Sequence, residues 1–247
     1  FKQKTAYEIL SGLVGSEMCI RDSLLVDGSS SPHTFQLKPS HATMLQEADI
    51  VFWIGEDLES FLETPLESIA KDAKQVTLME SEDIEMLKFR EKNVFDDHDE
   101  HGDEHDEHDE HEEHGDEHDE HAHHDGHNHG EFDIHFWLDP EIAKTIVQIA
   151  AKEMSEIDPA NASKYEANAA KALNELDQLI NDTRGKINKD ATYVVFHDAY
   201  QYFEQRFGIE VIGALTVNPE VLPGAKQLAE IRAVSYTHLT LPTNREV

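Results

Sequence analysis

Apolar residues in this chain form short continuous runs separated by stretches of helical period. The continuous apolar run Asp49–Ile54 is typical of a buried parallel strand, and further strands are predicted at Leu24–Val26 and Gln75–Met79. Helices are predicted between them. One opens at Pro39, with Met44, Leu45 and Ala48 on its inner side, and one covers Leu58–Ala70, where apolar residues recur on one helical face. This strand–helix–strand–helix–strand order predicts an α/β lobe built on a parallel sheet.

Helical patterns also follow the middle of the chain. Asp139 suits a helix N-cap and Pro140 suits the first helical position, so we predict a helix that begins there. Its predicted buried stripe contains Ile142, Ile146 and Ile149.

A second, longer helix is predicted from Asn161 to Ile187, and at 1.5 Å per residue it would extend about 40 Å. Its predicted apolar face holds Tyr165, Ala169, Leu173, Leu176 and Ile180. We interpret this helix as a rigid connection between two lobes.

A second α/β lobe is predicted after the long helix. Strands are expected at Ala191–Phe196 and Glu210–Leu215, with helices at Ala199–Phe207 and Ala225–Ala233. The predicted fold class is therefore α/β, with two parallel-sheet lobes joined by one long helix and the second lobe incomplete. The predicted organisation is a non-native extension (1–23), an N-terminal lobe (24–95), a His/Asp/Glu-rich loop (96–131), the end of the N-terminal lobe (132–158), a linking helix (159–189), the start of a C-terminal lobe (190–233) and a second non-native extension (234–247).

The two ends of the chain do not follow the pattern of the rest. Residues 1–23 lack a clear period, and both ends resemble translated sequencing-adapter text. Cys19 and His238 therefore have no predicted role. A lipoprotein anchor at Cys19 is disfavoured because Met18 is too large for the position before such a cysteine. The chain begins at Phe1 without a methionine, so the lack of a signal peptide does not indicate its compartment.

Charge is concentrated in one segment of the 247-residue chain. Residues 96–131 hold 18 Asp/Glu, 12 His and no Lys or Arg, and without them the formal charge of −32 falls to −14. The segment has almost no apolar residue to bury, so disorder is predicted in the absence of metal. Its imidazoles beside carboxylates predict weak metal sites, with a solvated loop as the alternative. These auxiliary histidines are His98, His101, His105, His108, His111, His114, His118, His121, His123, His124, His127 and His129.

The acidic balance and the cysteine content exclude several classes of protein. An acidic surface repels nucleic acid and anionic lipid, so no nucleic-acid partner is predicted. A single cysteine allows neither an internal disulfide nor a cysteine-based metal site. The sequence His121–His127 approaches a metallohydrolase motif, but Gly126 displaces its final histidine and no H-E-x-x-H occurs. We therefore predict that the chain is not an enzyme.

Three histidines outside the acidic segment share a context at the ends of predicted elements. His33 and His197 follow strands, and His135 precedes a helix. Ligands of open α/β sheets bind at the carboxyl ends of strands. Three imidazoles without cysteine suit Zn²⁺, although a single histidine at a strand end is more often structural. His41, in the first turn of a helix, is interpreted as a solvated surface residue.

Several separated motifs resemble one family. The segments SPHTFQLKPSHATMLQEADIVFWIGEDLESFL, HFWLDP and VFHDAYQYFEQRFG, with a His-rich acidic insert between the first two, resemble the zinc-binding proteins of the ZnuA type over residues 24–233. The resemblance implies a periplasmic protein that has lost its signal peptide, holds Zn²⁺ in an interlobe cleft through His33, His135 and His197, and delivers it to an ABC permease. Three roles remain open for the insert: feeding the cleft, reporting metal status, or interacting with a separate periplasmic zinc metallochaperone. The chain is expected to be a monomer.

The resemblance leaves alternatives and two departures. A manganese- or iron-binding protein or adhesin of the same fold is one alternative, although manganese members typically replace one histidine with a carboxylate. A zinc buffer or chaperone that works through the His-rich loop is the other. Pro32 occupies a position where some zinc members carry a glutamate. The late carboxylate that completes the site in many relatives is expected to lie beyond the end of this sequence, so three histidines and water are the expected ligands.

Overall fold

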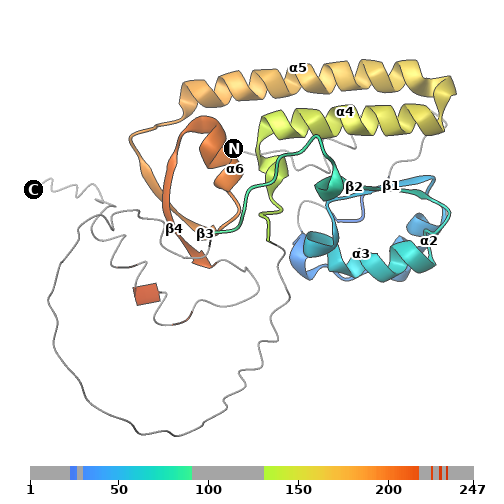
Figure 1. Cartoon of the computed structure of the whole chain (residues 1–247), viewed down its shortest axis with the longest axis horizontal. Helices are drawn as coiled ribbons and strands as arrows, with labels where there is room; N and C mark the ends of the chain where they lie inside the picture. Colours follow the sequence, from blue (N-terminus) through green and yellow to red (C-terminus); the bar gives the residue numbers. More distant parts are fainter. Residues whose placement is uncertain are drawn as a thin grey trace, which may run out of the picture.

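The strands that the structure describes form two separate parallel pairs. The computed structural model describes residues 23–26, 30–90, 131–216, 224, 228–229 and 232. Within these ranges β1 (Ile50–Trp53) pairs with β2 (Lys74–Thr77), and β3 (Thr192–His197) pairs with β4 (Glu210–Thr216) (Figure 1). Single turns of 3₁₀ helix are η1 (Pro32–Thr34), η2 (Leu78–Glu80), η3 (Phe136–Leu138) and η4 (Pro159–Asn161).

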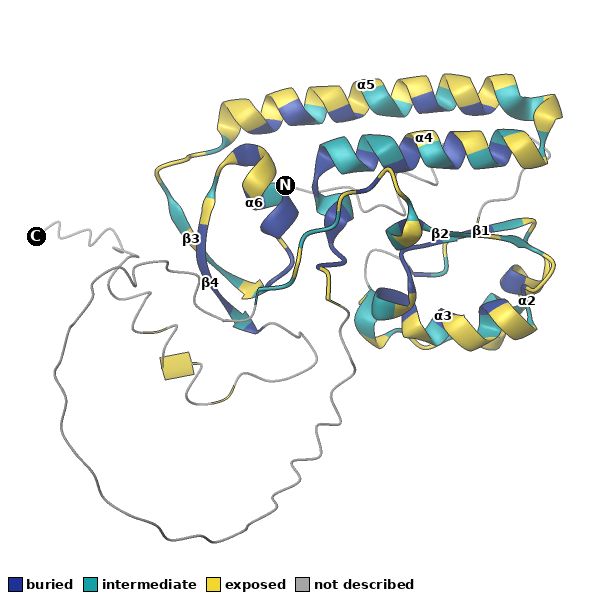
Figure 2. Cartoon of the chain, in the orientation of Figure 1, coloured by how far each residue is buried: buried dark blue, intermediate teal, exposed yellow. Residues whose placement is uncertain are grey.

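The first lobe has helices on both faces of the β1–β2 pair. Val51 and Trp53 pack with leucines of α3 (Glu56–Ser68) and with Leu45 of α2 (Pro39–Gln46), whereas Phe52 packs against the cluster formed by α4 and α5. This alternation follows from the two-residue period of a strand. Figure 2 shows exposed residues along the outer side of α5, which lies on the far side of α4 from the β1–β2 pair.

Helices α4 (Pro140–Ile157) and α5 (Ala162–Lys186) lie side by side along the first lobe (Figure 1). Asp139 caps α4 by accepting a hydrogen bond from the backbone N–H of Glu141, as predicted. Of the stripe predicted for α4, Ile146 is fully buried, but Ile142 and Ile149 are half-buried. Small residues on a second face of α4 let α5 pack close to it. The apolar period of the sequence did not distinguish this face from the predicted stripe. The deeply buried residues on that face are Ala143, Val147 and Ala150.

The chain passes from α5 into β3, and α6 (Gln201–Phe207) connects β3 to β4. Gly208 ends α6 in the left-handed conformation, with φ of 61°. The predicted class of two parallel-sheet lobes joined by one long helix is therefore confirmed. The helix expected at 225–233 lies mostly outside the described residues, as do residues 1–22 and 91–130, so the assignments made for those segments stay predictions.

Two local predictions were wrong. Residues 24–26 are described without regular structure rather than as a strand, although Val26 is 3% exposed. A segment this short reaches the core through side-chain packing and needs no strand partner. Met44, expected on the inner face of α2, is exposed, and Leu45 provides the burial there. Helix α2 has 8 residues and packs on one narrow side.

Glu59 closes the turn between β1 and α3. Its carboxylate accepts hydrogen bonds from the backbone N–H groups of Ile54, at 2.6 Å, and Gly55. The side chain is fully buried, and helical geometry is interrupted at this residue, with φ of −116° and ψ of 48°. Burial raises the pKa of Glu59 to about 7, against the opposing effect of the two backbone donors.

We expect Glu59 to make the protein less stable as pH rises. Because its folded pKa is raised from 4.5 to about 7, the folded chain holds a proton that the unfolded chain has lost in this window. The stability that Glu59 contributes is therefore fully present below its unfolded pKa and is lost as pH rises through 7. The full contribution is on the order of 3 kcal/mol. Denaturant titrations of the metal-free chain at several pH values should show a smaller fall for Glu59→Gln, and equal falls would contradict the assignment.

Candidate metal centre

His33 lies in η1, which packs against α3. Pro32 starts this turn and fixes its backbone. The residues that follow hold the segment in place, since the Phe35 ring stacks on His41 at 5.3 Å and contacts Phe61 at 5.1 Å between ring centroids. The His33 ring is half-buried.

His41 differs from the sequence interpretation. Its Nδ1 accepts a hydrogen bond from the backbone N–H of Lys38 at 3.2 Å, which caps the start of α2. The residue is therefore a structural cap stacked on Phe35, not a purely solvated side chain. Helical position alone did not reveal this, because both partners precede the helix.

His135 stands immediately before η3 and α4 and is 4% exposed. Its backbone N–H donates to Asp133 Oδ1 at 2.9 Å, and its ring Nδ1 lies 2.7 Å from the same oxygen. This contact orients the ring and assigns the proton to Nδ1, so that Nε2 presents a lone pair.

His197 is the last residue of β3 and belongs to the second lobe. It pairs in register with Thr216 at the end of β4, and the next residue, Asp198, donates its backbone N–H to the Thr216 carbonyl at 3.1 Å. The strand pair therefore fixes the backbone on both sides of the ring. Two histidines thus come from the first lobe and one from the second.

The three predicted histidines converge on one point. His135 Nε2 lies 3.4 Å from His33 Nε2 and 3.2 Å from His197 Nε2, and one ring nitrogen from each residue lies within 4.8 Å of the others. Within the described part of the chain, this is the one group of three or more potential ligands close enough to share an ion. Zn²⁺–N bonds of about 2.0–2.1 Å in a tetrahedron place neighbouring nitrogens about 3.3 Å apart. The two separations from His135 Nε2 fit that geometry.

Sequence reasoning did not identify Asp133. It is 2% exposed. The sequence signal that could have revealed it is a carboxylate two residues before a candidate metal-binding histidine. Tyr202 of α6 supports the same turn, because its hydroxyl donates to the Asp133 carbonyl at 2.6 Å and accepts from the Leu87 N–H at 2.8 Å. The second lobe therefore contacts the residue that orients His135 in the first lobe.

Replacing Asp133 with alanine is expected to weaken zinc binding by about 10–100-fold, because loss of a carboxylate behind a metal-binding histidine costs affinity on that scale. Asp133→Asn keeps an acceptor oxygen but loses the charge, so its affinity should fall between those of the native and alanine proteins. Competition with a chromophoric chelator measures all three. Native affinity in the alanine variant would show that Asp133 does not tune His135.

Buried charges lie on the second-lobe side of the three histidines. Asp198 and Glu204 are 3% and 7% exposed, and Arg90 from the first lobe contacts both. Burial raises the pKa of Asp198 to about 6, while the Arg90 guanidinium opposes that shift. Burial also raises the pKa of Glu204. These carboxylates depend on Arg90 for charge compensation.

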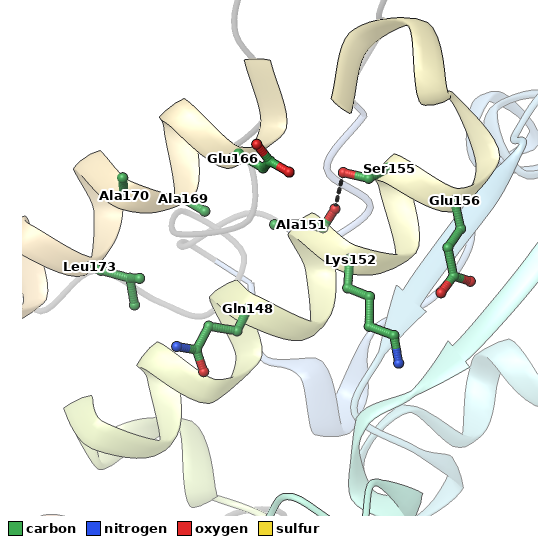
Figure 3. A pocket seen from close by; sticks show the side chains of 9 residues that line it. All are labelled: Gln148, Ala151, Lys152, Ser155, Glu156, Glu166, Ala169, Ala170 and Leu173. Carbon is green, nitrogen blue, oxygen red and sulfur yellow. Dashed lines mark hydrogen bonds between the residues drawn. The ribbon is translucent and has the colours of Figure 1, made fainter. Parts of the chain in front are cut away.

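A shallow hollow lies elsewhere, between α4 and α5 (Figure 3). It has a volume of about 560 Å³, and its lining residues come from these two helices alone, with Ala151, Ala169 and Leu173 among them. It contains no histidine and has no part in the three-histidine group. A zinc ion held by side chains needs little open volume, so the hollow does not compete as the metal site.

Residues 7–238 match the family described as "ZnuA: Zinc-uptake complex component A periplasmic". The chain belongs to the ZnuA family. This is a family of zinc-uptake components rather than of enzymes. The resemblance found in the motifs around His33, His135 and His197 is thereby confirmed at the level of the family.

Curated relatives in the ZnuA family share substantial sequence with this chain. The high-affinity zinc uptake system protein ZnuA of Brucella abortus is 45% identical over 219 residues, which is 85% of this chain. The protein of the same name from Yersinia pestis is 35% identical over 240 residues, covering 94% of this chain and 69% of the relative. The chain spans 65% of the length of the Brucella relative.

Solved structures show the same fold. A crystal structure of ZnuA has a TM-score of 0.70 at 22% identity, covering 95% of this chain and 76% of that one. A Zn(II)-bound variant of AdcAII from Streptococcus pneumoniae has a TM-score of 0.66 at 22% identity, covering 95% of this chain and 75% of that one.

Among the residues that the structure describes, no helix is both long and apolar enough to cross a membrane.

Proposed function

We propose that this protein is the zinc-capturing component of an ABC uptake system and that His33, His135 and His197 bind its cargo. The observation that carries the proposal is the spacing of the three Nε2 atoms, 3.4 Å and 3.2 Å from the central His135. Membership of the ZnuA family and relatives named as high-affinity zinc uptake proteins support zinc as the cargo and the periplasm as the compartment. An ABC permease is then the partner that receives it.

The donor set favours zinc over manganese. All three donors are imidazole nitrogens, and no carboxylate of the described residues joins them within 4.8 Å. Imidazole suits zinc, whereas carboxylate, carbonyl and water oxygens suit manganese. The burial of His135 and its contact with Asp133 prepare one ligand in advance, so less conformational entropy is lost when the ion binds. The fourth position is left to water.

Capture requires no covalent chemistry. The neutral rings bind the ion through nitrogen lone pairs, so protons compete with zinc and release is favoured as pH falls. Because His197 lies in the second lobe and the other two ligands in the first, the bound ion connects the lobes. Any separation of β3 from η3 would break a metal bond, which provides a route for delivery to the permease.

The His-rich loop, residues 96–131, carries the second candidate function, a zinc buffer or chaperone. It lies outside the described residues except at Glu131. Its 12 histidines beside 18 carboxylates motivate the hypothesis. In that case a periplasmic metallochaperone would be its partner, and the three-histidine centre would contribute little.

Zinc titration calorimetry on the full chain and on a chain lacking residues 96–131 separates the two functions. If the three-histidine centre captures the cargo, the shortened chain keeps one tight zinc, and the weaker sites disappear. Manganese titrated into the same shortened chain should bind much more weakly than zinc. Loss of tight binding on deletion would instead assign the cargo to the loop.

A further inference from the structure

Arg90 links the two lobes next to the histidine group. It lies in a short segment of the first lobe that runs antiparallel to the residues before Asp133, with Lys88 bridged to Phe132. Its guanidinium extends to the second lobe, where Nη1 lies 3.2 Å from Asp198 Oδ1. Its Nη1 and Nη2 contact the two carboxylate oxygens of Glu204.

The two carboxylates that contact Arg90 lie next to His197 and in the helix that supports the turn before His135. Asp198 is adjacent to His197 at the end of β3. Glu204 lies in α6, and two residues earlier in the same helix the Tyr202 hydroxyl donates to the Asp133 carbonyl. The arginine therefore connects the backbone that carries His197 to the strand segment that leads to His135.

The ion pairs of Arg90 are shielded from water. The side chains of Asp198 and Glu204 are 4% and 8% exposed, and that of Arg90 is 20% exposed. Removing one partner of a buried charge pair leaves the other uncompensated and is strongly destabilising. A planar guanidinium also fixes direction, since its donors match a carboxylate bidentately. The contact thus restrains distance and orientation together.

Neutral hydrogen bonds at the same junction do not replace this restraint. Gln201 Nε2 donates to the Lys88 carbonyl at 2.9 Å, and the Leu87 N–H donates to Tyr202. Both attach α6 to the first lobe, but neither reaches the turn at Asp198. Arg90 is the residue among these that contacts the neighbour of His197.

We propose that Arg90 is a positioning residue for zinc: by holding Asp198 and Glu204 it sets the position of His197 Nε2 relative to His135 and His33. This inference rests on the proposed zinc function of the three histidines. The ligand in question is a divalent cation that imidazole nitrogens coordinate tetrahedrally.

The sign of the effect separates positioning from simple electrostatics. A guanidinium near the site repels a divalent cation, so a purely Coulombic role predicts tighter binding when its charge is removed. Positioning predicts weaker binding, because the His197 nitrogen no longer stands at the tetrahedral separation. The two roles therefore give opposite results for Arg90→Gln.

The test uses the full chain with Arg90→Gln, Arg90→Lys and Lys88→Gln. Lys88 is the matched control, because it is a cation of the same segment whose side chain is 72% exposed and pairs with Glu131 rather than with the second lobe. Zinc affinity is measured by chelator competition. Cobalt(II) serves as a spectroscopic probe, since its visible absorption reports coordination geometry.

Arg90→Gln is expected to weaken zinc binding by about 10–100-fold, the cost of losing a residue that orients a ligand. It should also reduce and shift the cobalt absorption. Lysine restores the charge but not both contacts, so Arg90→Lys should recover part of the affinity. Lys88→Gln should match the native protein in both measurements. Native or tighter binding and a native spectrum in Arg90→Gln would overturn the proposal.

Glu204→Gln keeps the proposal testable if Arg90→Gln does not fold. It loses a charge but leaves the Arg90–Asp198 pair, and near-ultraviolet circular dichroism of the metal-free protein checks its packing. A folded Glu204→Gln variant with reduced affinity and an altered cobalt spectrum supports positioning, and one with native values overturns it. Failure of the zinc function itself is distinct, because the native chain would then bind no tight zinc that His135→Ala removes.

Discussion

His135→Ala is expected to lower the zinc affinity of this protein by more than about 100-fold, beyond the cost of losing a residue that only supports a ligand. His135 is the central member of the group, with the other two Nε2 atoms at 3.4 Å and 3.2 Å from its own. In the proposed site, its loss would remove a direct metal bond and the ring that Asp133 has already oriented. Calorimetry with a competing chelator measures the change in the chain without residues 96–131.

His41→Ala is the matched control for that substitution. His41 caps α2 and stacks on Phe35, outside the three-histidine group. We expect it to reduce the thermal stability of the protein slightly and to change zinc affinity far less than His135→Ala or His197→Ala. Equal losses of affinity in all three variants would contradict the assignment of His135 and His197 as zinc ligands.

Gly55→Ala is expected to destabilise the folded protein by about 4 kcal/mol, a sum of backbone strain and overpacking. Gly55 has φ of 152°, a conformation that L side chains rarely adopt. An added Cβ would also meet Met79, with its Cγ at 2.6 Å. Denaturant unfolding of the metal-free protein measures the free energy directly.

A control variant and a double variant test this explanation. Gly185 lies in α5 with nothing within 4 Å of an added Cβ, so Gly185→Ala should stabilise the protein by about 0.5–1 kcal/mol. Adding Met79→Ala to Gly55→Ala should relieve the overpacking and leave the backbone strain. A Gly55→Ala protein as stable as the native one would show that the β1–α3 turn adapts.

Much of the fold could be predicted because the patterns involved are local. The continuous apolar run at Asp49–Ile54 contains β1, and the apolar face from Tyr165 to Ile180 lies within α5. Asp139 caps α4 as its residue type suggested. Patterns too short to constrain the backbone were less informative. Residues 24–26 have few neighbours to specify a strand, and Met44 was assigned to the wrong side of a two-turn helix.

The sequence by itself indicated that His197 ends a strand, that His135 precedes a helix, and that the donor set is imidazole without cysteine, whereas the strand expected before His33 does not form. Tertiary structure alone decided that the Nε2 atoms of the three histidines meet, that Asp133 orients His135, and that Arg90 holds the turn after His197. His33 and His135 are 102 residues apart, and Arg90 and Asp198 are 108 apart. Contacts at such separations depend on how the lobes pack, and no local periodicity encodes that packing.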